Sequence, residues 1–162
     1  MDKTVFIQPQ SGLQFDWKAI SANPSGTYAP QLDLVAFKAL YTNKIAQARA
    51  CGQEPVLISL PVMDCDRYFA YITRGMTIQE RKNLLFWLGG TTERLRNLHD
   101  MYNLALFRLA AVHCVHIVDI TSPMLAHVHY QELLDRDGVT LSEQGEALVA
   151  SECSKAKMHE AA

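Results

Sequence analysis

A run of apolar residues flanked by prolines, Pro55 to Pro61, constrains the fold of this chain more than any other stretch. Between the prolines, only Ser59 is polar. Continuous apolar runs of this length are typical of strands covered on both faces, since a strand with one exposed face alternates apolar and polar residues. The run therefore predicts a buried strand of a parallel sheet.

The segments around this run alternate between strand-like and helix-like patterns. Val5–Ile7 and Val115–Ile120 are further apolar runs of strand length, whereas apolar residues recur at steps of three and four in Gln31–Ala50 and Leu95–Val112. Residues 8–30 are rich in turn formers and are predicted to be a loop. Strands that alternate with helices predict right-handed crossovers, a parallel α/β sheet and a single domain over residues 1–162.

Three polar motifs predict where other helices begin. Thr77 and Glu80 have the spacing of a capping box. Ser122 followed by Pro123 is a favourable pair for the N-cap and first position of a short helix. Ser142 is expected to cap a final helix that runs to about residue 157.

Composition excludes several classes of function. The formal net charge is -2, and no run of Lys or Arg is present, so a nucleic-acid surface is not expected. The apolar runs are too short to span a bilayer, and Met1–Thr4 has no signal-like pattern, which predicts a cytoplasmic protein. The four cysteines are scattered, which predicts reduced thiols, mostly packed as small apolar groups, with no metal and no cofactor.

The segment Asp137–Gly145 resembles the Asp-x-x-His block that closes SGNH (GDSL-type) ester hydrolases, with Thr140 at the position of the histidine. Glu54–Pro61 is similar to the penultimate strand of that family, and Leu85–Gly90 is similar to an insert in a bacterial branch of it. The resemblance covers roughly residues 28 to 150. It implies a three-layer, flavodoxin-like parallel sheet, here truncated to about three strands flanked by helices, with the family's N-terminal strands missing.

The resemblance implies few catalytic residues in this chain. No Gly-Asp-Ser nucleophile motif occurs, and the expected oxyanion-binding Asn falls near Gly12. Asp137 is the one catalytic position of the family that keeps its residue type, although an acid beside a glycine is also typical of a turn or helix cap. Ser11 is the best surviving serine at the carboxyl end of a strand, and His127 and His129 are the only remote bases that the pattern suggests.

Loss of one member of a catalytic triad commonly costs about four to six orders of magnitude in rate. The sequence therefore predicts an SGNH-hydrolase-like protein that is catalytically impaired or inactive and acts by association or ligand binding. The alternative is an active serine ester hydrolase, acting on acyl or acetyl esters of carbohydrates or small molecules. That alternative requires a rearranged site or an additional N-terminal part.

Further polar and aromatic residues are candidates for a substrate pocket. Asp64 and Asp66 follow the second strand, where they would bind a ligand or cation or cap the next turn. The resemblance places Tyr68 and Trp87 near the substrate cleft, whereas their residue types also suit the core. His127 and His129 would need further ligands to bind a metal, so they are expected to be surface residues.

The first predicted strand suggests a possible partner. If Val5–Ile7 is the edge of the sheet, its apolar side chains and backbone groups favour pairing with another chain. We therefore expect a homodimer that associates through this strand and the C-terminal helix. A small-molecule ester is the other expected partner.

Overall fold

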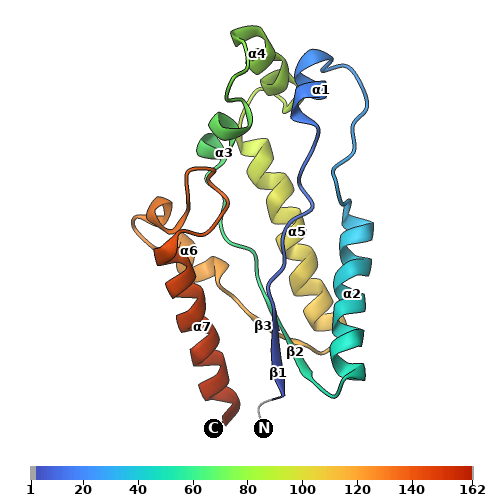
Figure 1. Cartoon of the computed structure of the whole chain (residues 1–162), viewed down its shortest axis with the longest axis vertical. Coiled ribbons are helices and arrows are strands. Elements are labelled where there is room, and N and C mark those ends of the chain that lie inside the picture. The colour runs from blue at the N-terminus through green and yellow to red at the C-terminus, as the bar shows by residue number, and fades with distance from the viewer. Residues whose placement is uncertain (1–2, 162) are drawn as a thin grey trace.

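The computed structural model describes residues 3–161, and its chain alternates between strands and helices (Figure 1). In chain order the elements are β1 (Thr4–Ile7), α1 (Trp17–Ala22), α2 (Leu34–Ala50), β2 (Glu54–Ile58), α3 (Cys65–Ile72), α4 (Ile78–Trp87), α5 (Glu93–Val112), β3 (His116–Val118), α6 (Thr121–Ala126), the 3-10 helix η1 (Tyr130–Leu133) and α7 (Glu143–Ala161). Across these residues, no helix combines the length and apolar character needed to cross a bilayer.

The three strands form one parallel sheet in the order β1-β2-β3. In the register of the sheet, Phe6 lies beside Val56, and Val56 lies beside His116. The predicted α/β class is confirmed, with three parallel strands flanked by helices. The central strand β2 contains Pro55 and the first half of the predicted apolar run but ends at Ile58, and β1 is an edge strand, as expected.

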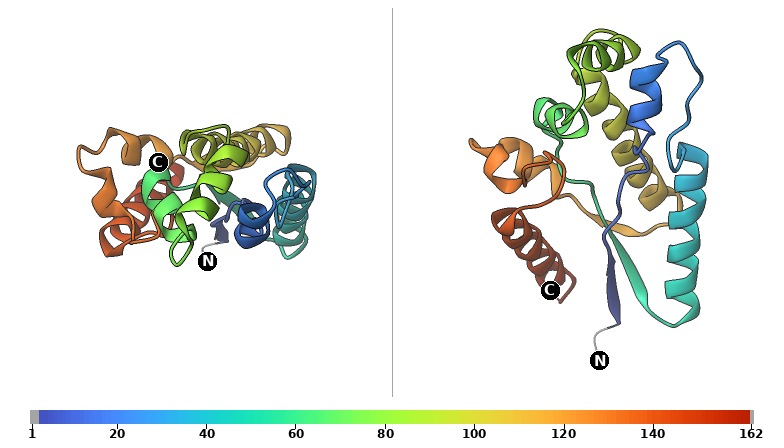
Figure 2. Two further views of the ribbon diagram at one scale, coloured as in Figure 1. Left: turned by 90° about the horizontal axis from the view of Figure 1, so that it is seen from above. Right: turned by 45° about the horizontal axis from the view of Figure 1, so that its top comes forward.

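Helices cover both faces of this sheet, so the fold has three layers. Along β2, Leu57 packs into the core formed with α2 and α5, whereas its neighbours Val56 and Ile58 pack into a second core with β3, α6 and α7. Figure 1 and the right-hand view of Figure 2 show α2 and α7 on opposite sides of the strands. Burial on both faces explains the absence of polar residues in the centre of β2.

Most helix boundaries follow from the capping residues. The backbone N–H of Glu80 donates to Thr77 Oγ1 at 3.1 Å and the N–H of Thr77 donates to Glu80 Oε1 at 3.2 Å, which confirms the capping box. Ser142 Oγ accepts from the N–H of Gly145 at 3.2 Å, so the predicted cap of α7 is also confirmed. The helix predicted from residue 31 begins at Leu34, because Asp33 caps it.

Two local predictions were wrong. The segment predicted as a loop contains the six-residue helix α1, which begins where Asp16 accepts from the N–H of Ala19. The short helix α6 begins at Thr121 rather than after Ser122, and Asp119 takes hydrogen bonds from both the backbone and the hydroxyl of Ser122. A helix as short as α1 offers too few turns for an apolar periodicity to reveal it.

Candidate functional site

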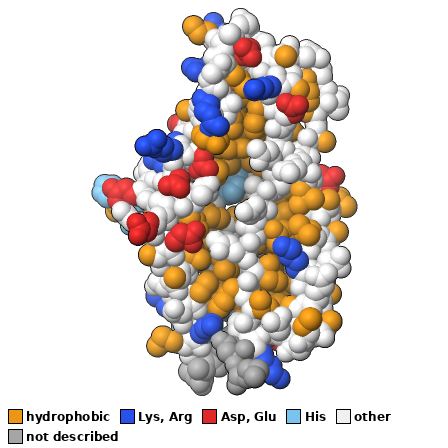
Figure 3. Space-filling model, viewed as in Figure 1, with side chains coloured by type: hydrophobic (Ala, Val, Ile, Leu, Met, Phe, Trp, Pro, Cys, Tyr) orange, Lys and Arg blue, Asp and Glu red, His pale blue; other side chains and the backbone are white. Residues whose placement is uncertain are grey.

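A cavity of about 610 Å³ lies beyond the carboxyl ends of β1 and β2. Its lining includes residues of the loop Gln8–Gln14, the segment Leu60–Met63, helix α3, and the loop Asp137–Leu141 before α7. Figure 3 shows one face of the molecule hollowed near its middle, with apolar side chains above and below the hollow. Ligands of open parallel sheets commonly bind at this end of the strands.

The loop after β1 places Ser11 in the cavity lining, where it is half-buried. The N–H of Gln10 donates to the Tyr41 hydroxyl at 3.0 Å, which fixes the start of this loop. A Cβ atom at Gly12 would lie 2.0 Å from the carbonyl oxygen of Leu32. This position therefore has no room for the asparagine that the family resemblance suggests there.

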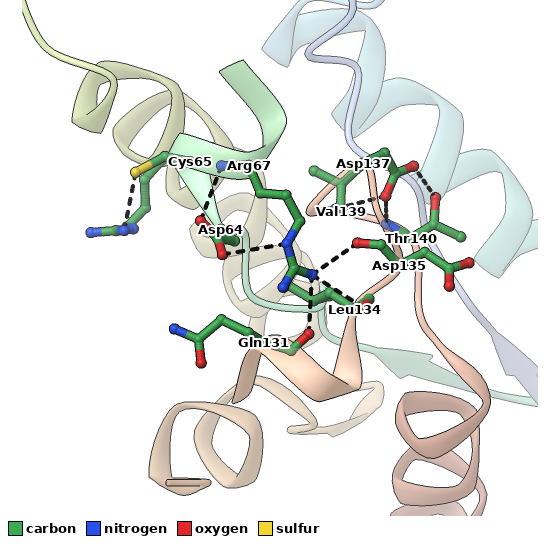
Figure 4. Close-up of polar contacts among 10 residues, drawn as sticks. Asp64, Cys65, Arg67, Gln131, Leu134, Asp135, Asp137, Val139 and Thr140 are labelled. Atoms are coloured by element: carbon green, nitrogen blue, oxygen red, sulfur yellow. Dashed lines mark hydrogen bonds and ion pairs between the residues drawn. The ribbon is translucent and has the colours of Figure 1, made fainter. Parts of the chain in front are cut away.

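Asp137 is hydrogen-bonded within its own loop, on the cavity wall (Figure 4). Its Oδ1 accepts from the backbone N–H groups of Val139 at 3.0 Å and Thr140 at 2.8 Å, and its Oδ2 accepts from the Thr140 hydroxyl. Burial alone would raise the pKa of Asp137, but the hydrogen bonds from Thr140 and Val139 outweigh it and hold this pKa below its ordinary value. The carboxylate is thus ionised near neutral pH and stabilises the turn.

The Asp137 loop is attached to the N-terminus of α3. Arg67 Nη1 donates to the carbonyl oxygens of Gln131, Leu134 and Asp135 at 3.1, 3.3 and 3.0 Å, while its Nε lies 3.8 Å from a carboxylate oxygen of Asp64 (Figure 4). The N–H of Asp64 also donates to the carbonyl of the loop residue Gly138 at 2.9 Å. These contacts fix one wall of the cavity.

Gly138 allows the close approach between this loop and α3. Its φ angle is +76°, and a Cβ atom here would lie 2.7 Å from the carbonyl oxygen of Asp64 and 2.9 Å from the backbone nitrogen of Tyr68. Gly75 has the same φ of +76° but nothing within 4 Å of its hypothetical Cβ. Comparing alanine substitutions at Gly138 and Gly75 therefore separates the cost of backbone strain from the cost of steric contact.

We predict that Gly138→Ala lowers the free energy of unfolding more than Gly75→Ala does. The strained φ costs both variants about 1–2 kcal/mol, and contact with α3 costs Gly138→Ala a further 1–3 kcal/mol or so. Urea denaturation of both variants measures the difference. Equal losses would show that the loop does not pack tightly against α3.

His99 of α5 also lines the cavity, with only 7% of its surface exposed. Its Nε2 lies 2.7 Å from the carbonyl oxygen of Pro61, which can only accept, so Nε2 carries the hydrogen. No group within residues 3–161 donates to its buried Nδ1. Burial lowers the pKa of His99 below the ordinary value of 6.5, so the imidazole is neutral near pH 7.

The buried imidazole predicts a specific dependence of stability on pH. Because the pKa of His99 is lower in the folded state, its stabilising effect is complete above about pH 6.5 and is lost as the pH falls towards the folded-state pKa. A difference of one bound proton corresponds to about 1.4 kcal/mol per pH unit. His99→Gln retains a donor for Pro61 but cannot titrate in this range.

Urea denaturation from pH 8 to pH 5 should therefore show a steeper loss of stability for the wild-type protein than for His99→Gln. Above pH 7 the difference in the free energy of unfolding between the two proteins should not change with pH. Parallel curves over the whole range would contradict burial of a neutral imidazole.

Of the two aromatic candidates, Tyr68 lines the cavity and Trp87 does not. Tyr68 is buried in the cavity lining, and burial raises the pKa of its hydroxyl to about 12. Trp87 is not in the lining and packs edge-on against Phe15 and Trp17, with ring centroids 5.1 and 6.5 Å away. Trp87 therefore contributes to an aromatic cluster beside the cavity.

The remaining candidates lie outside the cavity lining. Asp64 caps α3 by accepting from the N–H of Arg67 at 3.2 Å, and Asp66 is exposed and accepts from the Thr92 hydroxyl at 2.5 Å. His127 and His129 are exposed, and Nδ1 of the former accepts from the backbone N–H of the latter. Among the residues described, no group of three His, Cys, Asp or Glu side chains is placed to hold a metal.

Three of the residues predicted from the sequence thus line the same cavity: Ser11, Tyr68 and Asp137. His99 also lines it but was not predicted from the sequence. The sequence does indicate that His99 is buried, because it lies four residues after Leu95 and therefore on the same face of α5. An imidazole on an apolar helix face needs a polar partner in the core.

Comparison with known proteins finds a similar solved structure at low sequence identity. No protein-family model matches the chain, and no curated protein matches it. Among solved structures, the chain is similar to a lipase/acylhydrolase from Enterococcus faecalis, with 18% sequence identity and a TM-score of 0.47. The match covers 76% of this chain and 50% of that one, so the chain spans about half the length of that hydrolase.

Proposed function

We propose that this domain binds a small molecule in the cavity beyond β1 and β2, without using Asp137 in a Ser-His-Asp triad. The observation that supports this proposal is the hydrogen bonding of the Asp137 carboxylate. Its partners are the hydroxyl and N–H of Thr140 and the N–H of Val139, all in its own loop. In a triad, the acid would instead hold the imidazole that removes the proton from serine.

The surroundings of the serine in the cavity also support this proposal. Within residues 3–161, no hydrogen bond links the Ser11 hydroxyl to His99 or to Asp137. A serine hydroxyl is a weak nucleophile unless an adjacent base takes its proton. The cavity has the size range of small-molecule sites, which supports the binding of a small molecule there.

An active serine ester hydrolase is the second candidate, because Ser11 and His99 line the same cavity. Nδ1 of His99 is unprotonated in the tautomer fixed by Pro61, so it has the lone pair that a general base requires. Its lowered pKa makes it a weak base, however. The family resemblance suggests acyl or acetyl esters as substrates for this candidate.

Labelling with a fluorophosphonate probe and turnover of p-nitrophenyl acetate distinguish the two candidates. We expect no labelled serine and no turnover above that of Ser11→Ala, which removes only the hydroxyl. Labelling of Ser11 that also disappears in His99→Gln would favour the hydrolase and contradict the binding proposal.

Binding itself is tested with benzyl alcohol, a neutral probe small enough for the cavity. Millimolar benzyl alcohol should shift the amide NMR signals of Ser11, Val139 and Thr140, which lie at the cavity wall. The amide of Val56 in β2 serves as a control, because its side chain packs into the core on the α7 side. Shifts at Val56 without shifts at the wall would contradict binding in this cavity.

We also propose that the protein forms a homodimer through the edge of the sheet. β1 lies at one end of the strand order and its side chains are half-buried, so a second chain would cover them. Light scattering should give the mass of two chains at micromolar concentration. A monomer under those conditions would contradict this proposal.

A further inference from the structure

We propose that the cavity selects a cationic ligand, in which an ammonium group lies between Asp137 and Glu146 and an apolar part lies against Tyr68 and Tyr71. This inference rests on the ligand-binding function proposed above, and it names the chemical class of the ligand. It is supported by the charges of the cavity wall and by the imidazole beneath it.

The charged residues of the cavity lining have one sign. Among the residues that the structure describes, Asp137 and Glu146 are in the lining and no Lys or Arg is. Arg67 lies outside the lining, and its guanidinium is directed at Asp64 and at three carbonyl oxygens. Figure 4 shows the carboxylate of Asp137 pointing away from this guanidinium. A cleft lined by one sign of charge attracts ligands of the opposite sign and repels those of the same sign.

The carboxylate of Asp137 has capacity for a further donor. Its two oxygens accept three hydrogen bonds, from Val139 N, Thr140 N and Thr140 Oγ1, whereas an ionised carboxylate offers about four lone-pair sites. An ammonium group has several N–H donors and no acceptor, so it matches this wall. A ligand carboxylate beside the two acids of the lining would place like charges together. The guanidinium of Arg74 lies over the ring of Tyr71, 3.8 Å from its centroid, and is the nearby cation that the test of anionic ligands has to consider.

His99 provides the second and independent observation. Its side chain lines the cavity, is only 7% exposed, and has no protein donor for Nδ1 within the described chain. Because Nε2 donates to Pro61, Nδ1 can only accept, so a ligand N–H suits it and a ligand anion does not. Nδ1 itself is buried.

The rest of the lining suits the apolar part of such a ligand. Tyr68 and Tyr71 contribute aromatic rings from α3, and Leu60 and Met63 contribute apolar side chains from the segment after β2. Aromatic and aliphatic surfaces bury the hydrocarbon part of an amine, while the carboxylates bind its charged end. The expected ligand is therefore an aromatic or aliphatic amine that is protonated at neutral pH.

A series of three probes of similar shape tests this inference: benzylamine, benzyl alcohol and benzoate, which are cationic, neutral and anionic at pH 7. Titration of the ¹⁵N-labelled protein at low salt should give benzylamine at least about tenfold higher affinity than benzoate, with benzyl alcohol between them. The amide signals of Ser11, Val139 and Thr140 report occupancy of the cavity.

Two substitutions on α7 identify the source of the preference. Glu146→Gln should weaken benzylamine binding about threefold and leave benzyl alcohol unchanged, because it removes one partly solvated charge. Glu143→Gln is the matched control, since Glu143 is an exposed acid of the same helix that lies outside the lining. It should leave the affinity of both probes unchanged.

Each outcome has a distinct meaning. Benzoate binding as tightly as benzylamine, or equal effects of the two substitutions, would overturn the inference of a cationic ligand while leaving the binding function intact. If none of the three probes shifts the amides of the cavity wall, both the inference and the proposed binding function fail.

Discussion

Attachment of the Asp137 loop to the N-terminus of α3 determines the shape and chemistry of the candidate site. Arg67 binds three carbonyl oxygens before Asp137, and Gly138 approaches Asp64 so closely that a side chain would collide with it. Charge-assisted hydrogen bonds of this kind fix a loop more firmly than neutral ones. The cavity wall is therefore defined by contacts between segments about 70 residues apart in sequence, as in the pair Arg67 and Asp135 with a separation of 68.

Most of the fold follows from local sequence patterns. The prolines around β2, the helical spacing in α2 and the capping box of α4 each predicted an element that the structure contains. Short elements were less predictable, because α1 has six residues and α6 begins beside Asp119 rather than at Ser122. A capping carboxylate, Asp16, marks the start of α1, whereas the N-cap of α6 is Ile120, which makes no side-chain cap hydrogen bond.

The site was only partly predictable, because its members come together through tertiary contacts. Ser11 was predicted from its place after a strand and Asp137 from the family resemblance, and both line the cavity. His99 was missed because its neighbours in sequence suggest only a core helix, and its partner Pro61 is 38 residues away. Thr140 stands where the family resemblance suggests a histidine, and its hydroxyl donates a hydrogen bond to the Asp137 carboxylate.

The central claim is that Asp137 stabilises its loop and is not coupled to an imidazole. The most direct test is a ¹³C NMR titration of the Asp137 carboxyl group together with the ring signals of His99. The account predicts one inflection for Asp137, at a pH below 3.8, and no response of its signal when His99 changes protonation. A second inflection of Asp137 that coincides with the titration of His99, and that disappears in His99→Gln, would contradict it.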